Sequence, residues 1–145
     1  MNEIRADYNK YLVLQLRAID SHGAWKGLSD EELLQRAYLV PSAEEEKKPI
    51  PLMPEQFVRF QLQASAQILE QETGLIPFVV CETGCDGSVK AFVISGKIVI
   101  FQKVFYNTGD FRYRNIEKLF TKGEKVTEKI LENYKSISEV TQSLF

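Results

Sequence analysis

Two cysteines stand four residues apart in the middle of the chain, and thiolates are ligands that iron, zinc and iron–sulfur clusters prefer. A complete four-ligand site needs more than two thiols, and the only histidine, His22, lies far away in the sequence. Cys81 falls in a β-like segment, where a small buried residue is the simpler interpretation. Cys85 falls in a turn, where it is either an ordinary turn residue or a metal ligand completed by a partner or a second copy.

A run of basic and aromatic residues between Lys103 and Lys125 is a second candidate site. Basic side chains interleaved with aromatic rings can bind nucleic acid or an anionic cofactor. The candidate binding residues in this run are Lys103, Arg112, Tyr113 and Arg114. Glu117 and Glu124 dilute the charge of the run, so a solvated helix face with a packed loop is the alternative interpretation.

His22 and Trp25, the only histidine and the only tryptophan, flank Gly23 and form a third candidate site. A helix-ending turn with a packed indole is one interpretation, because tryptophan usually buries most of its surface. The alternative is a recognition corner in which the indole stays half exposed.

Patterns that would support catalysis are missing from the sequence. A hydrolase needs a nucleophile, a base and an orienting group, but there is one imidazole and no Gly-x-Ser-x-Gly pattern. The paired carboxylates fall at a predicted helix start, Glu31 and Glu32, and in a charged connector at 44–46, where helix-dipole and solvation roles explain them. The turn at 84–87 lacks the spacing and the following helix of a phosphate-binding loop. We therefore predict that the protein is not an enzyme.

The length and composition are those of an ordinary globular protein, and 145 residues are enough to bury a core without disulfides or a metal. A net charge of -2 and a pI near 5.5 provide no overall attraction to nucleic acid or to acidic membranes. No apolar run reaches the length of about 18 residues that suggests a membrane-spanning helix, and no signal-peptide pattern begins at Met1. We expect a cytoplasmic protein with reduced thiols and with no nucleic-acid or membrane partner.

The longest β-like passage, from Phe78 to Phe105, must position both the cysteines and the start of the basic run. Two turn signals divide it into an antiparallel meander of three strands, at residues 78–83, 88–95 and 97–105. In the middle strand Val89, Ala91 and Val93 share one face, because side chains alternate across a strand. One face of this sheet must meet helices, and the other is either partly covered or a binding surface.

Apolar residues at helical spacing predict helices on both sides of the meander. The first begins near Ile4 and stops by Gly23, and the second opens at Ser29 with a capping box and ends before Pro41. The third runs from 54 to 73, and the last, from 116 to about 134, is one long helix or two that break near Gly123. Residues 41–54 hold four of the five prolines and form a connector within one domain. The predicted fold is therefore a single α+β domain at 1–145, with about four helices packed on a three-stranded sheet.

Several blocks of this sequence match a known family in order. Residues 15–25, QLRAIDSHGAW, and 29–34, SDEELL, resemble the QLRAQDSYGTW…SDEELL opening of the NifX-associated nitrogen fixation proteins. Shorter matches follow at 49–51, 72–74, 95–99, 116–119 and 123–125. The likeness covers about residues 10–135, and its opening block is the most specific part.

The resemblance implies a small non-enzymatic accessory protein of nitrogen fixation that helps to make or handle the iron–molybdenum cofactor of nitrogenase. It implies cofactor assembly proteins as partners and an iron–sulfur or iron–molybdenum precursor as a transient ligand, with no cofactor required for folding. A homodimer is also left open. The alternative is a protein–protein interaction or regulatory module with no small-molecule ligand.

The chain departs from the family pattern at two positions. Residues 85–87 read Cys-Asp-Gly where the family has His-Glu-Gly, and the second family histidine falls on Gly109. The chain therefore resembles a divergent member of the family, with Cys85, Arg112 and Arg114 as candidate replacements. The turn at 84–87 and the exit from the last strand lie at the same end of a meander, so one shared site is open geometrically.

The arrangement of the aromatic residues would distinguish ligand binding from the interaction module. An open pocket around Phe105, Phe111 and Tyr113, with Arg112 or Arg114 pointing inward, favours ligand binding. The same rings packed flat or in a dimer interface favour the interaction module.

Overall fold

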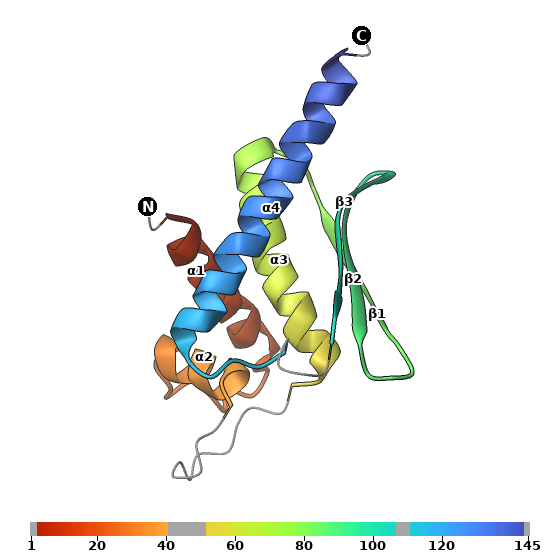
Figure 1. Cartoon of the computed structure of the whole chain (residues 1–145). Helices are drawn as coiled ribbons and strands as arrows, with labels where there is room; N and C mark the ends of the chain where they lie inside the picture. Colours follow the sequence, from red (N-terminus) through yellow and green to blue (C-terminus); the bar gives the residue numbers. More distant parts are fainter. Residues whose placement is uncertain (1–2, 41–51, 107–110, 144–145) are drawn as a thin grey trace.

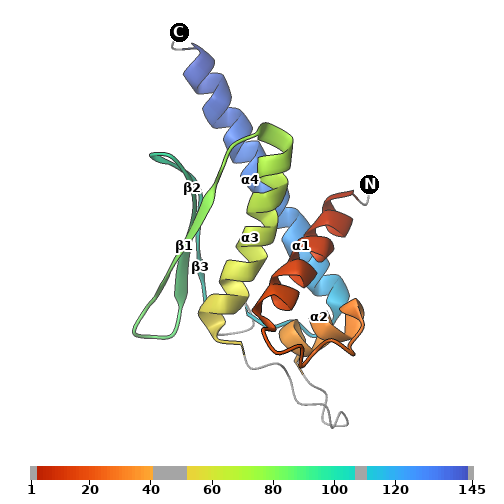
Figure 2. The ribbon, with the colours of Figure 1, turned by 180° about the vertical axis from the view of Figure 1, so that it is seen from behind.

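The computed structural model describes residues 3–40, 52–106 and 111–143. Its elements are, in order, α1 (Glu3–Ile19), α2 (Asp30–Tyr38), α3 (Pro54–Thr73), β1 (Phe78–Thr83), β2 (Val89–Ser95), β3 (Ile98–Phe105) and α4 (Ile116–Ser143). The strands form one antiparallel sheet in the order β1-β2-β3, and the helices stand together on one side of it (Figures 1 and 2). The predicted α+β class and three-stranded meander are confirmed, with strand bounds within one residue of those expected.

The core lies between the sheet and the helices and continues among the four helices themselves. Val89, Ala91 and Val93 of β2 are fully buried on the helix-facing side, as the alternation predicted. The helix α3 is central, since it contacts α1, α4, β1 and β2. The opposite face of the sheet carries exposed apolar side chains, among them Phe78 at 64% and Val99 at 46% exposure.

The ends of α2 and α3 follow local sequence signals. The Ser29 hydroxyl accepts a hydrogen bond from the Glu32 amide at 3.1 Å, which satisfies one free donor at the start of α2. At the end of α3, Gly74 adopts the left-handed conformation, φ 77°, that glycine tolerates best. Of the predicted connector at 41–54, residues 41–51 lie outside the described residues, while Met53 caps α3 and Pro54 begins it.

The last helix, α4, is continuous, so Gly123 does not break it. Gly123 is buried where α4 crosses α1, and a Cβ atom there would lie 2.2 Å from Cε1 of Tyr8. Close approach of two helices, and not a need for flexibility, therefore explains this glycine. In the described ranges, no helix has the length and apolar character needed to cross a membrane.

Candidate functional site

The segment that leads into α4 is anchored to α2 by backbone hydrogen bonds. The Tyr113 amide donates to the Tyr38 carbonyl and the Val40 amide donates to the Tyr113 carbonyl, each at 2.8 Å. The Tyr113 side chain is buried, and its hydroxyl donates to Oε1 of Gln61 on α3 at 2.7 Å. Tyr113 is thus held at a fixed place among α2, α3 and α4.

A small cavity, which we call the inner cavity, lies beside Tyr113 between α3, β3 and α4. Its volume is about 150 Å³, and its polar lining residues are Tyr8, Gln61, Ser65, Lys103, Tyr113, Lys122 and Lys125. Among the described residues that line it, none is acidic. Three lysines and no described carboxylate make this a place suited to negative charge.

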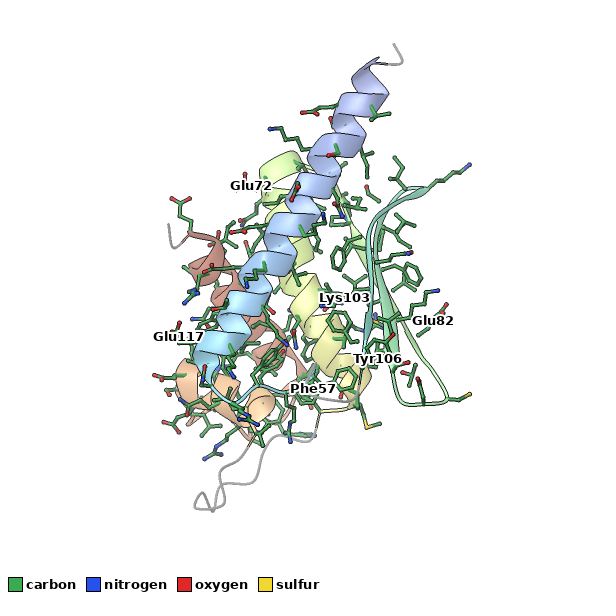
Figure 3. The ribbon with its side chains drawn as sticks, viewed as in Figure 1. Phe57, Glu72, Glu82, Lys103, Tyr106 and Glu117 are labelled. Atoms are coloured by element: carbon green, nitrogen blue, oxygen red, sulfur yellow. The ribbon has the colours of Figure 1, made fainter. Side chains whose placement is uncertain are left out.

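The predicted binding residue Lys103 reaches the inner cavity because of strand register. Lys103 pairs with Ala91 and Phe105 pairs with Val89, and both partners face the helices, so Lys103 faces them too. In Figure 3 Lys103 lies between β3 and the helices. The ammonium group lies 5.1 Å from the centroid of the Phe105 ring, a cation–π contact that keeps it at the cavity wall.

A larger cleft of about 740 Å³, the outer cleft, adjoins the inner cavity at Tyr113, Lys122 and Lys125. It adds the cations of Arg112, Arg114 and Lys118, and also the carboxylate of Glu117. The predicted residues Lys103, Arg112, Tyr113 and Arg114 therefore border two adjoining hollows. The Arg112 guanidinium also lies 5.4 Å from the centroid of the Phe57 ring, which holds it against α3.

The lysines of α4 form one stripe along the helix. Lys118, Lys122 and Lys125 follow one another at spacings of four and three, which places them on one face. Like charges at this spacing repel each other, so the stripe opposes helix stability unless something negative lies against it. Lys122 is held in place by its contact with the Tyr113 ring, 5.3 Å from ammonium to centroid.

Two acidic residues of the same helix, Glu117 and Glu124, are paired with Arg5 of α1. Arg5 donates to Glu117 at 2.7 Å, to Thr121 at 3.2 Å and to Glu124 in a short ion pair. The bonds to Glu124 and Glu117 raise the pKa of Arg5 above its usual value. Glu117 and Lys103 lie on opposite sides of α4 in Figure 3. The carboxylates expected to dilute the basic run are therefore paired with Arg5.

Two buried tyrosines near the inner cavity remain protonated at neutral pH. Burial raises the pKa of Tyr8 well above its usual value, and the neighbouring Tyr113 and Tyr38 add to the effect. Burial, followed by the nearby Tyr113, likewise raises the pKa of Tyr38. Both hydroxyl groups therefore keep their protons and can donate hydrogen bonds.

The buried aromatic residues meet only part of the arrangement that was expected for ligand binding, which was an open pocket with Arg112 or Arg114 pointing inward. Phe105, Phe111 and Tyr113 are all buried, and Phe105 and Tyr113 form part of the wall of the inner cavity. Arg112 and Arg114 line the outer cleft and not the inner cavity. The rings thus belong to the packed wall, while lysines supply the charge at the inner cavity.

Cys85 lies at the exposed tip of the β1–β2 hairpin and lines neither the inner cavity nor the outer cleft. Its neighbour Asp86 accepts from Ser88, at 3.0 Å from the amide and 2.6 Å from the hydroxyl, and these bonds lower its pKa. Within the described residues, no group of three or more His, Cys, Asp or Glu side chains could hold a metal. A metal at Cys85 would therefore need other ligands from outside this set. Cys81 is half-buried on β1, and burial raises the pKa of its thiol.

His22 and Trp25 belong to a structural turn between α1 and α2. Asp20 accepts hydrogen bonds from the amides of Ala24, at 2.8 Å, and Trp25, at 2.9 Å. Arg17 donates to the Trp25 carbonyl at 2.8 Å, and the indole is half-buried against the core. His22 is exposed, and neither His22 nor Trp25 lines the two basic hollows.

Gln61 and Ser65 of α3 were missed by the sequence reasoning. Both are buried, although the apolar stripe of α3 would be expected to hold hydrophobic residues there. The signal was present, because a glutamine and a serine interrupt the stripe at helical spacing from Phe57. A buried polar residue in such a stripe must find a partner, which makes it a pointer to a site.

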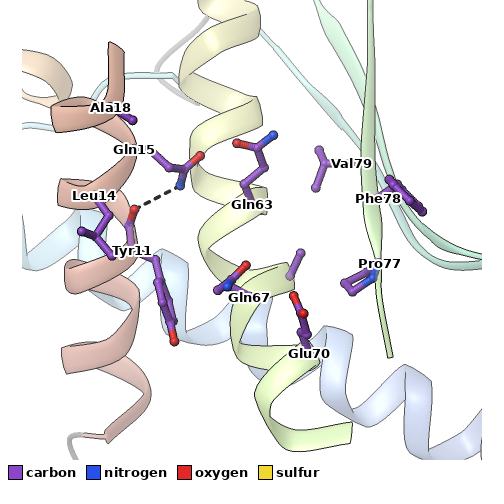
Figure 4. A pocket seen from close by; sticks show the side chains of 11 residues that line it. Tyr11, Leu14, Gln15, Ala18, Gln63, Gln67, Glu70, Pro77, Phe78 and Val79 are labelled. Atoms are coloured by element: carbon purple, nitrogen blue, oxygen red, sulfur yellow. Dashed lines mark hydrogen bonds between the residues drawn. The ribbon is translucent and has the colours of Figure 1, made fainter. Parts of the chain in front are cut away.

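A further hollow, the α1–β1 groove, lies between α1, α3 and β1 and has a volume of about 480 Å³ (Figure 4). Its described lining residues include Gln63, Gln67 and Val79, and its only charged lining residue among them is Glu70. Gln15 spans the helices here, since its Nε2 donates to the Phe60 carbonyl at 2.8 Å. The groove is therefore open and carries no described cation.

The family described as "Protein of unknown function, DUF269" matches residues 25–142. The chain belongs to the DUF269 family. Its relatives include "UPF0460 protein in nifX 3'region" of Rhodobacter capsulatus, 24% identical over 97% of this chain and 92% of the relative. Another is "UPF0460 protein y4vQ" of Sinorhizobium fredii, 26% identical over 92% of this chain and 85% of the relative.

A crystal structure of another DUF269 protein has the same fold. It comes from the cyanobacterium Cyanothece 51142, and its protein is described as associated with nitrogen fixation. The TM-score is 0.72, with 26% sequence identity over 92% of this chain and 90% of that one. The resemblance to NifX-associated proteins is thus confirmed at the level of the family.

Proposed function

We propose that this protein is a non-catalytic accessory protein of nitrogen fixation that binds an anionic ligand at the inner cavity and outer cleft. The observation that carries the proposal is the gathering of six cations around two adjoining hollows, namely Lys103, Arg112, Arg114, Lys118, Lys122 and Lys125. The pairing of Glu117 and Glu124 with Arg5 supports it. The family context supports nitrogen fixation as the process.

Within that process, the ligand we propose is the iron–molybdenum cofactor or a precursor of it, handed over by assembly proteins in the cytoplasm. Clusters of this kind carry negative charge, which the basic cleft would balance. The outer cleft, at about 740 Å³, is within the range of about 300–1,000 Å³ that is usual for small-molecule sites.

The test is anaerobic incubation of the full chain with isolated iron–molybdenum cofactor, followed by gel filtration and measurement of molybdenum and iron in the protein peak. We expect both metals to co-elute with the protein, and Arg112→Gln combined with Arg114→Gln to reduce their uptake. Lys97→Gln, an exposed change in the β2–β3 turn, is the control and should leave uptake unchanged. Absence of both metals from the wild-type peak would contradict the proposal.

Cys85→Ser tests whether the exposed thiol takes part. If Cys85 ligates the cluster, the variant should lose uptake while Cys81→Ser does not. Uptake equal to that of the wild type would remove the thiol from the site and leave the basic hollows as the binding surface.

The second candidate function is an interaction module without a small ligand, and the uncovered outer face of the sheet is the observation that favours it. This face exposes Phe78, Val80 and Val99, whereas the opposite face packs on helices. The predicted homodimer is tested with it, by analytical ultracentrifugation of the wild type and of Val99→Lys. A concentration-dependent dimer that the substitution dissociates, together with no metal uptake, would favour the module.

A further inference from the structure

We propose that the inner cavity is a site for a compact tetrahedral dianion, such as phosphate, sulfate or molybdate. The anion would be held by Lys103, Lys122 and Lys125 and would accept a hydrogen bond from Nε2 of Gln61. This inference rests on the anion-binding function proposed above and specifies the ligand of its inner part.

Gln61 supplies the observation that points to a ligand. Its side chain is 7% exposed and lines the cavity, and its Oε1 accepts from the Tyr113 hydroxyl at 2.7 Å. Its Nε2 is buried and has no hydrogen-bond partner among the described residues. A buried donor without a partner is costly, so such groups normally meet a ligand or an ordered water.

The charges around Gln61 determine what kind of ligand fits. The ammonium groups of Lys103 and Lys122 are held at the wall by the rings of Phe105 and Tyr113, at 5.1 and 5.3 Å from the ring centroids. Lys125 lines the same cavity one helical turn beyond Lys122. Several positive charges facing one small space favour a ligand that carries more than one negative charge.

A second buried donor lies close to this group. The Tyr38 hydroxyl is buried and has no hydrogen-bond partner in the described part of the chain. Tyr38 is close enough to Tyr113 for the two to influence each other electrostatically. Tyr38 does not line the inner cavity itself, so Nε2 of Gln61 is the one buried, unpartnered donor among the described residues that do.

The volume excludes larger ligands from the inner cavity. Its 150 Å³ exceeds the roughly 10–15 Å³ that one water requires but falls below the roughly 300 Å³ at which pockets for drug-sized ligands begin. A nucleotide or a whole metal cluster would therefore have to stay in the outer cleft. A tetrahedral oxyanion is small enough to enter.

The test is thermal unfolding and isothermal titration of the full chain with sodium phosphate, sulfate and molybdate, each compared with sodium chloride at equal ionic strength. We expect at least one dianion to raise the unfolding midpoint beyond chloride and to bind with saturation. The three arms show which dianion is preferred. No saturable binding by any of them would overturn the inference.

Gln61→Glu is the decisive variant, because it keeps the shape of the side chain while replacing the donor with a carboxylate. We expect binding to weaken by about tenfold or more, as for loss of a hydrogen bond to a charged group. Gln63→Glu, two residues away on α3 in the α1–β1 groove, adds the same charge and should leave binding unchanged. Unchanged binding in Gln61→Glu would contradict the assignment.

Lys125→Met is the second variant, since this exposed residue can change without affecting the core. It should weaken dianion binding, and Lys97→Met should not. Failure of the dianions to bind while the cofactor still co-elutes would refute this inference alone. Loss of both would refute the proposed function as well.

Discussion

The inner cavity and the α1–β1 groove share α3 as a wall, yet they present opposite chemistry. Gln61 faces the first and Gln63 the second, because two residues along a helix turn the side chain to the other side. Gln61 is buried in a cavity lined by three lysines, whereas Gln63 is only half-buried in a groove whose one charged described lining residue is Glu70. The same residue type thus marks a ligand site in one hollow and an ordinary partly solvated surface in the other.

The largest expected effect on the difference between the two hollows comes from substitution of Gly123, which lines the inner cavity but not the groove. We expect Gly123→Ala to lower the free energy of unfolding by about 1–3 kcal/mol, the usual cost of overpacking, because the new methyl group meets the Tyr8 ring. Anion binding should fall with it. Urea unfolding measures the effect, and Gly27→Ala, where a Cβ has open space, is the control. Equal stability of the two variants would contradict the close α1–α4 packing.

Alkaline pH should distinguish the tyrosines of the two hollows. Above their usual pKa of 10.0, unfolded tyrosines lose protons while buried ones keep them, so the folded state binds more protons and stability falls as pH rises. The expected slope is about 1.4 kcal/mol per pH unit for each fully shifted group. Tyr8→Phe should flatten this fall in urea unfolding more than Tyr11→Phe.

The reason for that difference is the environment of each ring. The pKa of Tyr8 is raised well above its usual value by burial, whereas a hydrogen bond from Gln71 partly offsets the rise for Tyr11 in the groove. Equal flattening by both substitutions would mean that the two hollows do not differ in desolvation.

Substitution of Arg5 should have the smallest effect, and it tests the difference in charge between the basic hollows and the α1–β1 groove. Arg5→Gln leaves the carboxylates of Glu117 and Glu124 without their cation, so their negative charge opposes an anion in the inner cavity, which the same helix lines. We expect weaker dianion binding at low salt and a smaller difference at high salt, because salt screens exposed charges. Isothermal titration at two salt concentrations measures it, and Arg59→Gln, whose partner Glu55 lies outside the basic hollows, is the control. An effect that is independent of salt would argue against an electrostatic role.

Much of the fold could be predicted because its signals are local. The alternation in β2, the Ser29 cap and the stop at Gly74 each depend on a few neighbouring residues, and the structure has all three. The structural role of Gly123 could not be predicted, because it depends on contact with Tyr8, which lies more than a hundred residues earlier in the chain. Local reasoning could offer only a possible helix break there.

The candidate site was predicted in part. The basic run was visible, and Lys103, Arg112, Tyr113 and Arg114 do border the two adjoining hollows. His22, Trp25 and Cys85 line neither of them. Gln61 was missed because it becomes meaningful only when α3, β3 and α4 meet around it.

The sequence by itself determined the helices, the meander and the presence of a basic stretch, because periodicity and turn chemistry act over short distances. Tertiary structure alone decided that this stretch forms a positively charged hollow. Folding brings Arg5 of α1 onto Glu117 and Glu124, while Lys122 and Lys125 turn toward Lys103 and Gln61. Net charge along a sequence averages the two signs, whereas a helix places them on different faces, and its neighbours determine which sign a ligand meets.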